Sequence, residues 1–223
     1  MILFSIIQAR TSSKRLKNKV LKKIKKKMLI EYVYDSVKNC KLFDEIIIAT
    51  SKNNSDKKIV DWCKRKKIKF YTGSLNNVSK RFYDICKYNQ FDYFLRVCAD
   101  SPLLDMRLVK SNLRYLKKNQ IVTNCLKKTF PKGQSIEVIS RKCFLENYKN
   151  FKKKHQEHVT KFFYENSSNF KIKNFLLKKN MRHIRLSVDT ISDLKRIEKI
   201  LSKIKKASYN YSYKKYIKFY KQI

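Results

Sequence analysis

The chain has 223 residues, 43% of them hydrophobic, which is enough for one domain with a substantial core. Its formal net charge of +38 suggests an anionic partner, but the abundant residues are Lys, Asn, Ile, Phe and Tyr, whereas Gly and Pro occur only twice each. This usage is the one expected from A/T-rich codons, and the lysines are spread along the chain. Codon usage therefore explains much of the charge, and nucleic-acid binding is not favoured as the main function.

The cysteines and the apolar runs indicate a cytoplasmic protein. Six cysteines occur without C-x-x-C spacing, which is typical of buried free thiols in a reducing compartment. No apolar run is long enough for a signal peptide or a membrane span. The cysteines are Cys40, Cys63, Cys86, Cys98, Cys125 and Cys143.

Strand and helix patterns alternate through the first 124 residues. The apolar run 2–7 predicts a buried strand, followed by a cationic loop over residues 8–21. Further strands are predicted at 45–50, 68–71, 92–98 and 120–124, and helices at 28–37, 54–66, 78–88 and 108–116. Such alternation indicates βαβ units with right-handed crossovers, and hence an α/β fold with a mostly parallel sheet.

The pattern changes after residue 124. Strands are predicted at 135–139, 170–175 and 184–188, and helices at 144–151, 155–163 and 191–204. Thr190 and Asp193 form a plausible capping pair at the start of the last of these helices. Aromatic and Lys residues at helical spacing predict a helical tail within 207–223, packed against its own domain or a second subunit. We interpret residues 1–223 as one domain.

The loop over residues 8–21 has the composition of a polyphosphate-binding segment. Arg10, Arg15 and Lys19 supply three cations close together, and the intervening hydroxyls can bind phosphate oxygens. Because ligands bind at the carboxyl ends of parallel strands, the segments starting at Gln8, Thr50 and Asp100 are expected at one edge of the sheet. The structural alternative is a solvated basic turn.

Two aspartates follow predicted strands and could bind a metal ion at that edge. Asp100 and Asp189 each precede a predicted helix or turn, where a carboxylate can hold Mg²⁺ against a nucleotide triphosphate. The structural alternative for each is a helix N-cap. His155, Glu157 and His158 lack a further ligand at a convincing spacing, so a zinc site is not favoured.

Motifs along nearly the whole chain resemble one enzyme family, the sugar-activating cytidylyltransferases. The similarity is greatest to the branch associated with spore-coat polysaccharide biosynthesis, akin to the CMP-sialic acid and CMP-KDO synthetases. The motifs are Gln8-Ala9-Arg10 with Ser13, Arg15-Leu16 and Lys19-Val20-Leu21; Ile47 to Ser51; Gly73-Ser74 with Val78 and Arg81; Arg96-Val97 with Asp100 and Pro102-Leu103; Thr129-Phe130-Pro131 with Gly133, Glu137 and Val138; Glu157-His158-Val159-Thr160; and Val188-Asp189-Thr190 with Asp193-Leu194.

The resemblance implies a Rossmann-like α/β/α sandwich of the nucleotide-diphospho-sugar transferase type, Mg²⁺ dependence and a homodimer. It implies catalytic roles for Arg10, Lys19 and Asp100, and metal binding by Asp100 and Asp189. The nucleotide-binding residues it implies are Gln8, Ala9, Arg10, Ser13, Arg15, Lys19, Thr50, Ser51, Ser74 and Asp100. Glu137, Glu157 and His158 are implied on the side of the acceptor sugar, and residues 125–165 as a subregion for dimerisation or acceptor binding.

The loop departs from the family pattern in its glycines. Ser12 replaces a Gly before Ser13, and Lys17-Asn18 replaces Pro-Gly before Lys19. Asn tolerates a left-handed backbone, so Asn18 is expected to make the turn that Gly makes elsewhere. Ser135 stands where an Asp is common in the family.

The favoured hypothesis is an enzyme that transfers CMP from CTP to a sugar, an acidic 2-keto-3-deoxy sugar being the first candidate. Two alternatives remain open. One is a nucleotide-sugar glycosyltransferase on a similar fold, although Asp100 is followed by Ser101-Pro102 rather than a second Asp of a D-x-D pair. The other is a non-catalytic basic binding module, supported by charge alone.

Overall fold

The computed structural model describes residues 1–223, built around a seven-stranded sheet of order β5-β4-β1-β6-β8-β7-β9. The strands are β1 (Leu3–Gln8), β4 (Glu45–Ser51), β5 (Phe70–Gly73), β6 (Tyr93–Cys98), β7 (Ile121–Thr123), β8 (Glu137–Ser140) and β9 (Ile172–Asn174). Only β8 is antiparallel to its neighbours. The predicted Rossmann-like α/β fold with a mostly parallel sheet is confirmed.

One face of the sheet is covered by α1 (Leu29–Asn39), α2 (Lys57–Arg65) and α4 (Arg107–Lys110). Each long helix turns an apolar stripe to the sheet. In α1, for example, Ile30, Val33 and Val37 are buried in the same cluster as Ile7 and Leu95. Burial of these stripes is the main force that holds the layer in place.

The opposite face is covered by α3 (Val78–Tyr88), α5 (Arg141–Asn147) and α6 (Lys161–Glu165). Its core is aromatic: the Phe144 ring lies 5.5 Å from the Phe94 ring and 6.0 Å from the Phe163 ring, measured between centroids. These contacts join α5 and α6 to the central strand β6, so the segment after β8 has a fixed position over the sheet.

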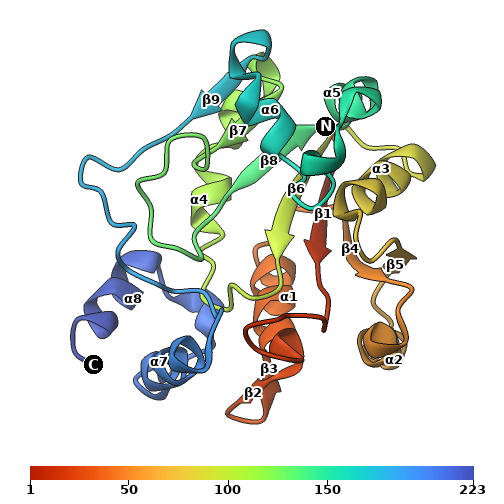
Figure 1. Cartoon of the computed structure of the whole chain (residues 1–223). Helices are drawn as coiled ribbons and strands as arrows, with labels where there is room; N and C mark the ends of the chain where they lie inside the picture. Colours follow the sequence, from red (N-terminus) through yellow and green to blue (C-terminus); the bar gives the residue numbers. More distant parts are fainter.

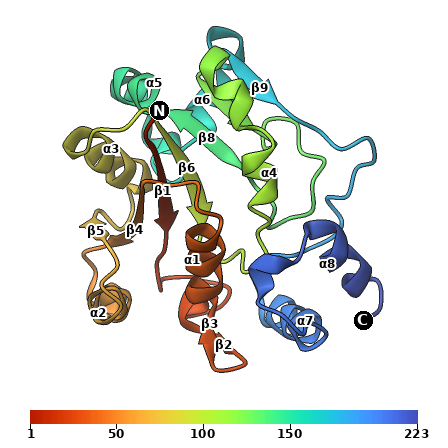
Figure 2. The same cartoon turned by 180° about the vertical axis from the view of Figure 1, so that it is seen from behind.

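A third cluster lies beyond the carboxyl ends of β1 and β6, where α7 (Ile191–Ser202), α8 (Tyr213–Tyr220) and the hairpin β2 (Lys23–Ile24)–β3 (Lys27–Met28) gather (Figures 1 and 2). The Lys25 ammonium donates to the carbonyl of Leu201 at 2.6 Å, which ties the hairpin to α7. In the tail, α8 buries Tyr216 and Ile217 against its own chain. The helix predicted there is confirmed.

Two predicted elements are wrong. Residues 184–188 form no strand of the sheet: the segment makes one isolated parallel bridge, between Arg185 and Lys132. Its alternating apolar residues Ile184, Leu186 and Val188 are buried against the α7–α8 cluster instead. Residues 155–163 do not form one helix, because a 3-10 turn (Lys153–His155) ends there and α6 starts only at Lys161.

Other boundaries differ more modestly. The helix predicted at 108–116 is split into α4 and a 3-10 helix, Leu113–Lys118. The β2–β3 hairpin was not predicted, since its strands have two residues each and the turn between them consists of lysines with positive φ. The Thr190–Asp193 capping pair is confirmed. No helix has the length and apolarity required to cross a bilayer.

Candidate active site

The ends of β1 and β6 place two functional segments side by side. Gln8 pairs with Cys98 in the parallel register, so the loop after β1 and the turn carrying Asp100 leave the sheet together. The start of the loop is anchored from below by Asp56, which is fully buried. One oxygen of the Asp56 carboxylate accepts from the Thr11 backbone N–H and hydroxyl, both at 2.6 Å, and the other accepts from the Ser51 hydroxyl.

The loop then turns at Asn18, which has φ of +56° and ψ of +29°, in the left-handed region. The Asn18 backbone N–H donates to the Thr11 carbonyl at 3.1 Å, closing the loop on itself. Asn18 therefore makes the left-handed turn predicted for it, and the short 3-10 helix that follows (Lys19–Leu21) brings Lys19 into the site.

Lys19 lies between the two aspartates. Its ammonium is 2.7 Å from Asp100 Oδ2 and 3.0 Å from Asp189 Oδ1, and Arg15 donates to the same Asp189 oxygen at 3.0 Å. Burial alone lowers the pKa of Lys19, but the charges and hydrogen bonds of the two aspartates outweigh it and raise that pKa above its ordinary value. Lys19 is therefore charged at neutral pH.

Arg10 makes a second ion pair across the site. Its Nη2 lies 2.5 Å from Glu157 Oε1, in the segment before α6. The hydrogen bond from Arg10, together with its charge and that of other nearby cations, holds the pKa of Glu157 below its usual range despite partial burial. Both side chains stay partly exposed, so the pair can open when another anion approaches.

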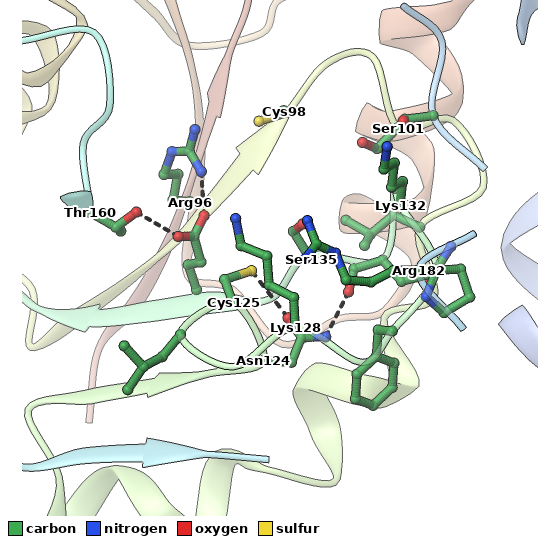
Figure 3. Close-up of a pocket in the computed structure, with 18 of the residues that line it drawn as sticks. Arg96, Cys98, Ser101, Asn124, Cys125, Lys128, Lys132, Ser135, Thr160 and Arg182 are labelled. Carbon is green, nitrogen blue, oxygen red and sulfur yellow. Dashed lines mark hydrogen bonds and ion pairs between the residues drawn. The ribbon is translucent and has the colours of Figure 1, made fainter. Parts of the chain in front are cut away.

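These residues surround two adjoining cavities. The loop cavity, about 760 Å³, is lined by the cationic loop together with Arg81, Glu157 and His158. The side cavity, about 800 Å³, extends over β8 and the segment 124–135 (Figure 3). Five residues line both and mark the junction: Arg96, Cys98, Asp100, His158 and Asp189. Two substrates bound in the two cavities would meet at this junction.

Glu137 lies on the floor of the side cavity and is buried, with 3% of its side chain exposed. One carboxylate oxygen accepts from the Thr160 hydroxyl at 2.6 Å and from the Tyr164 hydroxyl at 2.8 Å, and the other forms an ion pair with Arg96. Burial raises the pKa of Glu137, but the Arg96 charge and these hydrogen bonds outweigh it, and its pKa lies below the ordinary value.

The structure brings most predicted site residues together. Those lining the loop cavity are Gln8, Ala9, Arg10, Ser13, Arg15, Lys19, Asp100, Glu157, His158 and Asp189, and Glu137 lines the side cavity. Three others lie outside both cavities. Thr50 and Ser51 are buried beneath the loop, and Ser74 lines a smaller hollow next to Lys52 and Tyr71.

Three residues that shape the site were not assigned roles from the sequence. Arg81 is buried in the wall of the loop cavity, donates to the Ala49 carbonyl at 3.1 Å, and has its pKa lowered to about 10 by burial and by Arg10. Asp56 anchors the loop. Arg96, on β6, contacts both cavities. The sequence feature that could have identified Arg96 is the presence of a charged residue inside an apolar strand. No sequence feature pointed to Asp56.

The chemistry of the donors fits a hard divalent cation. Asp100 and Asp189 offer carboxylate oxygens close to one ammonium, and about a quarter of each side chain is exposed. No group of three or more His, Cys, Asp or Glu side chains is arranged to hold a metal ion. The pair therefore fits Mg²⁺, which uses one or two carboxylates and takes its other ligands from substrate phosphates and water.

A loop that can neutralise a triphosphate, next to a cavity for a second molecule, is the arrangement of a nucleotidyltransferase. The chain belongs to the cytidylyltransferase family, whose sequence profile matches residues 4–221. It is thus a member of a family of nucleotidyltransferase enzymes.

Three individual relatives each match half of the chain or more. An uncharacterized protein of Methanocaldococcus jannaschii is 38% identical over 200 residues, covering 87% of this chain and 81% of the relative. Spore coat polysaccharide biosynthesis protein SpsF of Bacillus subtilis is 25% identical over 211 residues, covering 91% and 87%. A 3-deoxy-manno-octulosonate cytidylyltransferase of Fusobacterium nucleatum is 28% identical over 116 residues, covering 52% and 46%.

Among solved structures, a cytidylyltransferase from Leptospira borgpetersenii serovar Hardjo-bovis has the same fold. It superposes with a TM-score of 0.92 at 24% identity, covering 100% of this chain and 94% of that one.

Proposed function

We propose that this enzyme transfers CMP from CTP to a hydroxyl of a sugar and releases pyrophosphate, for the synthesis of a surface polysaccharide or glycan. The observation that carries the proposal is the position of Lys19, Asp100 and Asp189 where the loop cavity meets the side cavity. A triphosphate in the loop cavity would present its α-phosphate at this junction, where the sugar hydroxyl can attack it.

The three loop cations have distinct tasks in that reaction. Arg10 and Arg15 bind non-bridging oxygens of the triphosphate, for which they give up Glu157 and Asp189. Lys19, held at the junction, stabilises the charge that develops as the sugar oxygen forms its bond to the α-phosphorus and the bond to pyrophosphate breaks in line. The proton of the sugar hydroxyl is released to solvent. Catalysis is then positioning and charge neutralisation, with no covalent enzyme intermediate.

Asp100 and Asp189 would hold Mg²⁺, as the fit of their carboxylates to that ion supports. When bound, the ion supplies further neutralisation of the phosphate charge. Gln8, Ala9 and Ser13 line the same cavity and belong to the nucleotide side. Ser51 would act on the nucleotide only through Asp56 and the loop that Asp56 anchors. Thr50 is buried beneath that loop, and Ser74 would act only from the hollow beside it.

The side cavity is the proposed acceptor site, and residues 125–165 supply much of its wall. His158 lines both cavities, Glu157 the loop cavity and Glu137 the floor, so these three lie where an acceptor would reach the nucleotide. The name of the Fusobacterium relative supports an acidic 2-keto-3-deoxy sugar as acceptor, and that of the Bacillus relative supports a polysaccharide pathway.

The proposal extends to the state of the protein in the cell. A homodimer follows the family pattern, with 125–165 as the candidate contact region in addition to its acceptor role. Six cysteines without a disulfide support a reducing cytoplasm.

Thermal-shift titration tests the nucleotide, and a screen for released pyrophosphate tests the reaction. We expect CTP with Mg²⁺ to raise Tm and UDP-sugars to leave it unchanged, because a ligand stabilises the folded state that binds it. Incubation with CTP and a panel of acidic sugars should then release pyrophosphate with one of them. Stabilisation by UDP-sugars instead of CTP would favour a glycosyltransferase, and a salt-sensitive response to nucleic acid alone would favour a binding module.

A further inference from the structure

Arg96 is a largely buried cation in the central strand, and neither the loop nor the metal site explains its position. It lies on β6, with 13% of its side chain exposed, and it is one of the five residues that line both cavities. A guanidinium at this depth needs an electrostatic reason to be there, since desolvating a charge is costly.

The guanidinium is held from two sides. Its Nε donates to the Gln8 side-chain oxygen at 3.1 Å, on β1, and its Nη1 pairs with Glu137, on β8. In Figure 3, dashed lines from Arg96 and Thr160 meet on one carboxylate. The hydrogen bonds of the two residues identify it as that of Glu137. The Arg96 fork is therefore fixed between three strands, whereas Nη2 makes no hydrogen bond within the chain.

The partners of Glu137 occupy most of the hydrogen-bonding capacity of its carboxylate. One of its oxygens is saturated by Thr160 and Tyr164, and the other faces Arg96. Tyr164 is held in turn, because its hydroxyl lies 2.9 Å from that of Thr123. Thr160 and Tyr164 both donate their hydroxyl protons to the carboxylate, so the nitrogen of this network that has no partner in the chain is Nη2 of Arg96.

We propose that Arg96 is a substrate-contacting residue that binds an oxyanion at the junction of the two cavities, and that Glu137 positions it. The inference rests on the proposed function. Two groups can supply the oxyanion: the α-phosphate of the nucleotide, or a carboxylate on the acceptor sugar. A planar guanidinium with two nitrogens fixed by the protein presents its third in one direction, which suits such a group better than a mobile ammonium.

Isothermal titration calorimetry separates the two sources. CMP and cytidine differ by the phosphate alone, and 3-deoxy-manno-octulosonate, titrated in the presence of CMP, supplies a carboxylate. The test protein is the double variant Arg96→Gln/Glu137→Gln, which removes both charges and keeps side chains that can hydrogen-bond. Lys142→Gln/Glu146→Gln, which removes both charges of an exposed pair on α5, is the matched control.

If the oxyanion is the α-phosphate, the double variant should bind CMP about ten- to a hundredfold more weakly than wild type, the range for one hydrogen bond to a charged group. Cytidine affinity should not change. If the oxyanion is the acceptor carboxylate, the double variant should keep its affinity for CMP, and its affinity for the sugar acid should fall about ten- to a hundredfold. Unchanged affinity for both CMP and the sugar acid would show that the pair is purely structural and would overturn the proposal.

Two further variants protect the test from a folding failure. Arg96→Lys keeps the ion pair with Glu137 but lacks the fork, and it should lose at least about fivefold in affinity for the same anionic ligand, because an ammonium is a point charge without the planar fork. Glu137→Gln alone should weaken binding of the anionic ligand and leave the affinity for cytidine unchanged. A general loss of stability would weaken binding of both. Failure of wild-type protein to bind either CTP or CMP would instead refute the proposed function.

Discussion

Lys19 and Asp100 form a 2.7 Å ion pair across the ends of two neighbouring strands, β1 and β6. The same ammonium lies 3.0 Å from Asp189, so one cation bridges the two carboxylates that we propose for metal binding. The free site therefore carries its own counterion. Substrate triphosphate and metal ion would separate this pair, each taking the partner of opposite charge.

Replacing Lys19 with Met should have opposite effects on turnover and on binding of a free metal ion. Turnover should fall about 10²- to 10³-fold, as for loss of one preorganised transition-state contact. Affinity for Mn²⁺ without nucleotide should rise, because Asp100 and Asp189 lose the ammonium that occupies them. Calorimetry with Mn²⁺ measures the second effect, and Lys64→Met, on the exposed side of α2, is the control. Weaker Mn²⁺ binding in the Lys19 variant would contradict the shared-counterion arrangement.

Arg10→Ala should reduce pyrophosphate release about 10²- to 10³-fold while leaving the melting temperature close to wild type. The side chain is about one-third exposed and its one ion pair, with Glu157, is at the surface, where such pairs contribute little to stability. Glu157→Gln provides the comparison, since it frees Arg10 from its partner and should not weaken CTP binding. Near wild-type turnover in Arg10→Ala would show that Arg10 does not bind the triphosphate.

Asp56→Asn should weaken CTP binding although Asp56 lies outside both cavities. Its carboxylate joins the start of the cationic loop, at Thr11, to the end of β4, at Ser51. The Asn amide has only one oxygen that can accept hydrogen bonds, so it cannot bond both Thr11 and Ser51 as the carboxylate does. The variant should therefore lose about 1–3 kcal/mol of stability, and the loop should become more mobile. Chemical denaturation and CTP titration measure the two effects. Loss of stability with unchanged CTP affinity would mean that the loop keeps its shape without this anchor.

Glu137 should contribute to the acid sensitivity of the fold. Its pKa is lower in the folded protein than in the unfolded chain, so its stabilising contribution is complete above an unfolded pKa of about 4.3 and is lost as pH falls through the lower folded value. At neutral pH, Glu137→Gln leaves Arg96 buried without its counterion and should cost about 3–5 kcal/mol.

Denaturation curves at pH 7 and below pH 4 check this: the difference in unfolding free energy between wild type and Glu137→Gln should shrink on acidification. Glu146→Gln, which removes an exposed carboxylate 3.9 Å from Lys142, is the control and should show little difference at either pH. If the difference in unfolding free energy between wild type and Glu137→Gln were the same at both pH values, the loss of stability would come from packing and not from charge.

Sequence patterns predicted the parallel half of the sheet well because those strands are buried on both faces. The runs ending at Gln8, Ser51 and Cys98 are mostly apolar, and their order with the helices between them leaves few topologies. The cationic loop and Asp100 were located by the same rule, since the ends of such strands form one edge. Asp189 was placed there from a predicted strand, 184–188, that the structure replaces with a single bridge between Arg185 and Lys132.

Long-range contacts were beyond the reach of such patterns. Ile184, Leu186 and Val188 alternate like a strand, but the neighbour that buries them is the α7–α8 cluster and not a sheet edge. The helix predicted through His155 fails because its ring accepts from the Lys152 N–H and bonds Glu165 at 2.9 Å, while its carbonyl accepts from Ser79. No local period encodes partners such as these, nor the anchoring of the loop by Asp56.

The pairing of Lys19 with Asp189, 170 positions apart, also has a consequence for how the protein is made. All seven strands of the central sheet precede residue 175, so during translation the sheet can assemble while Asp189 and α7 are still inside the ribosome. Until they emerge, Lys19 lacks one of its two carboxylates and the hairpin lacks its attachment to Leu201. Competence to bind nucleotide would thus be a late event in biosynthesis, reached after most of the fold already exists.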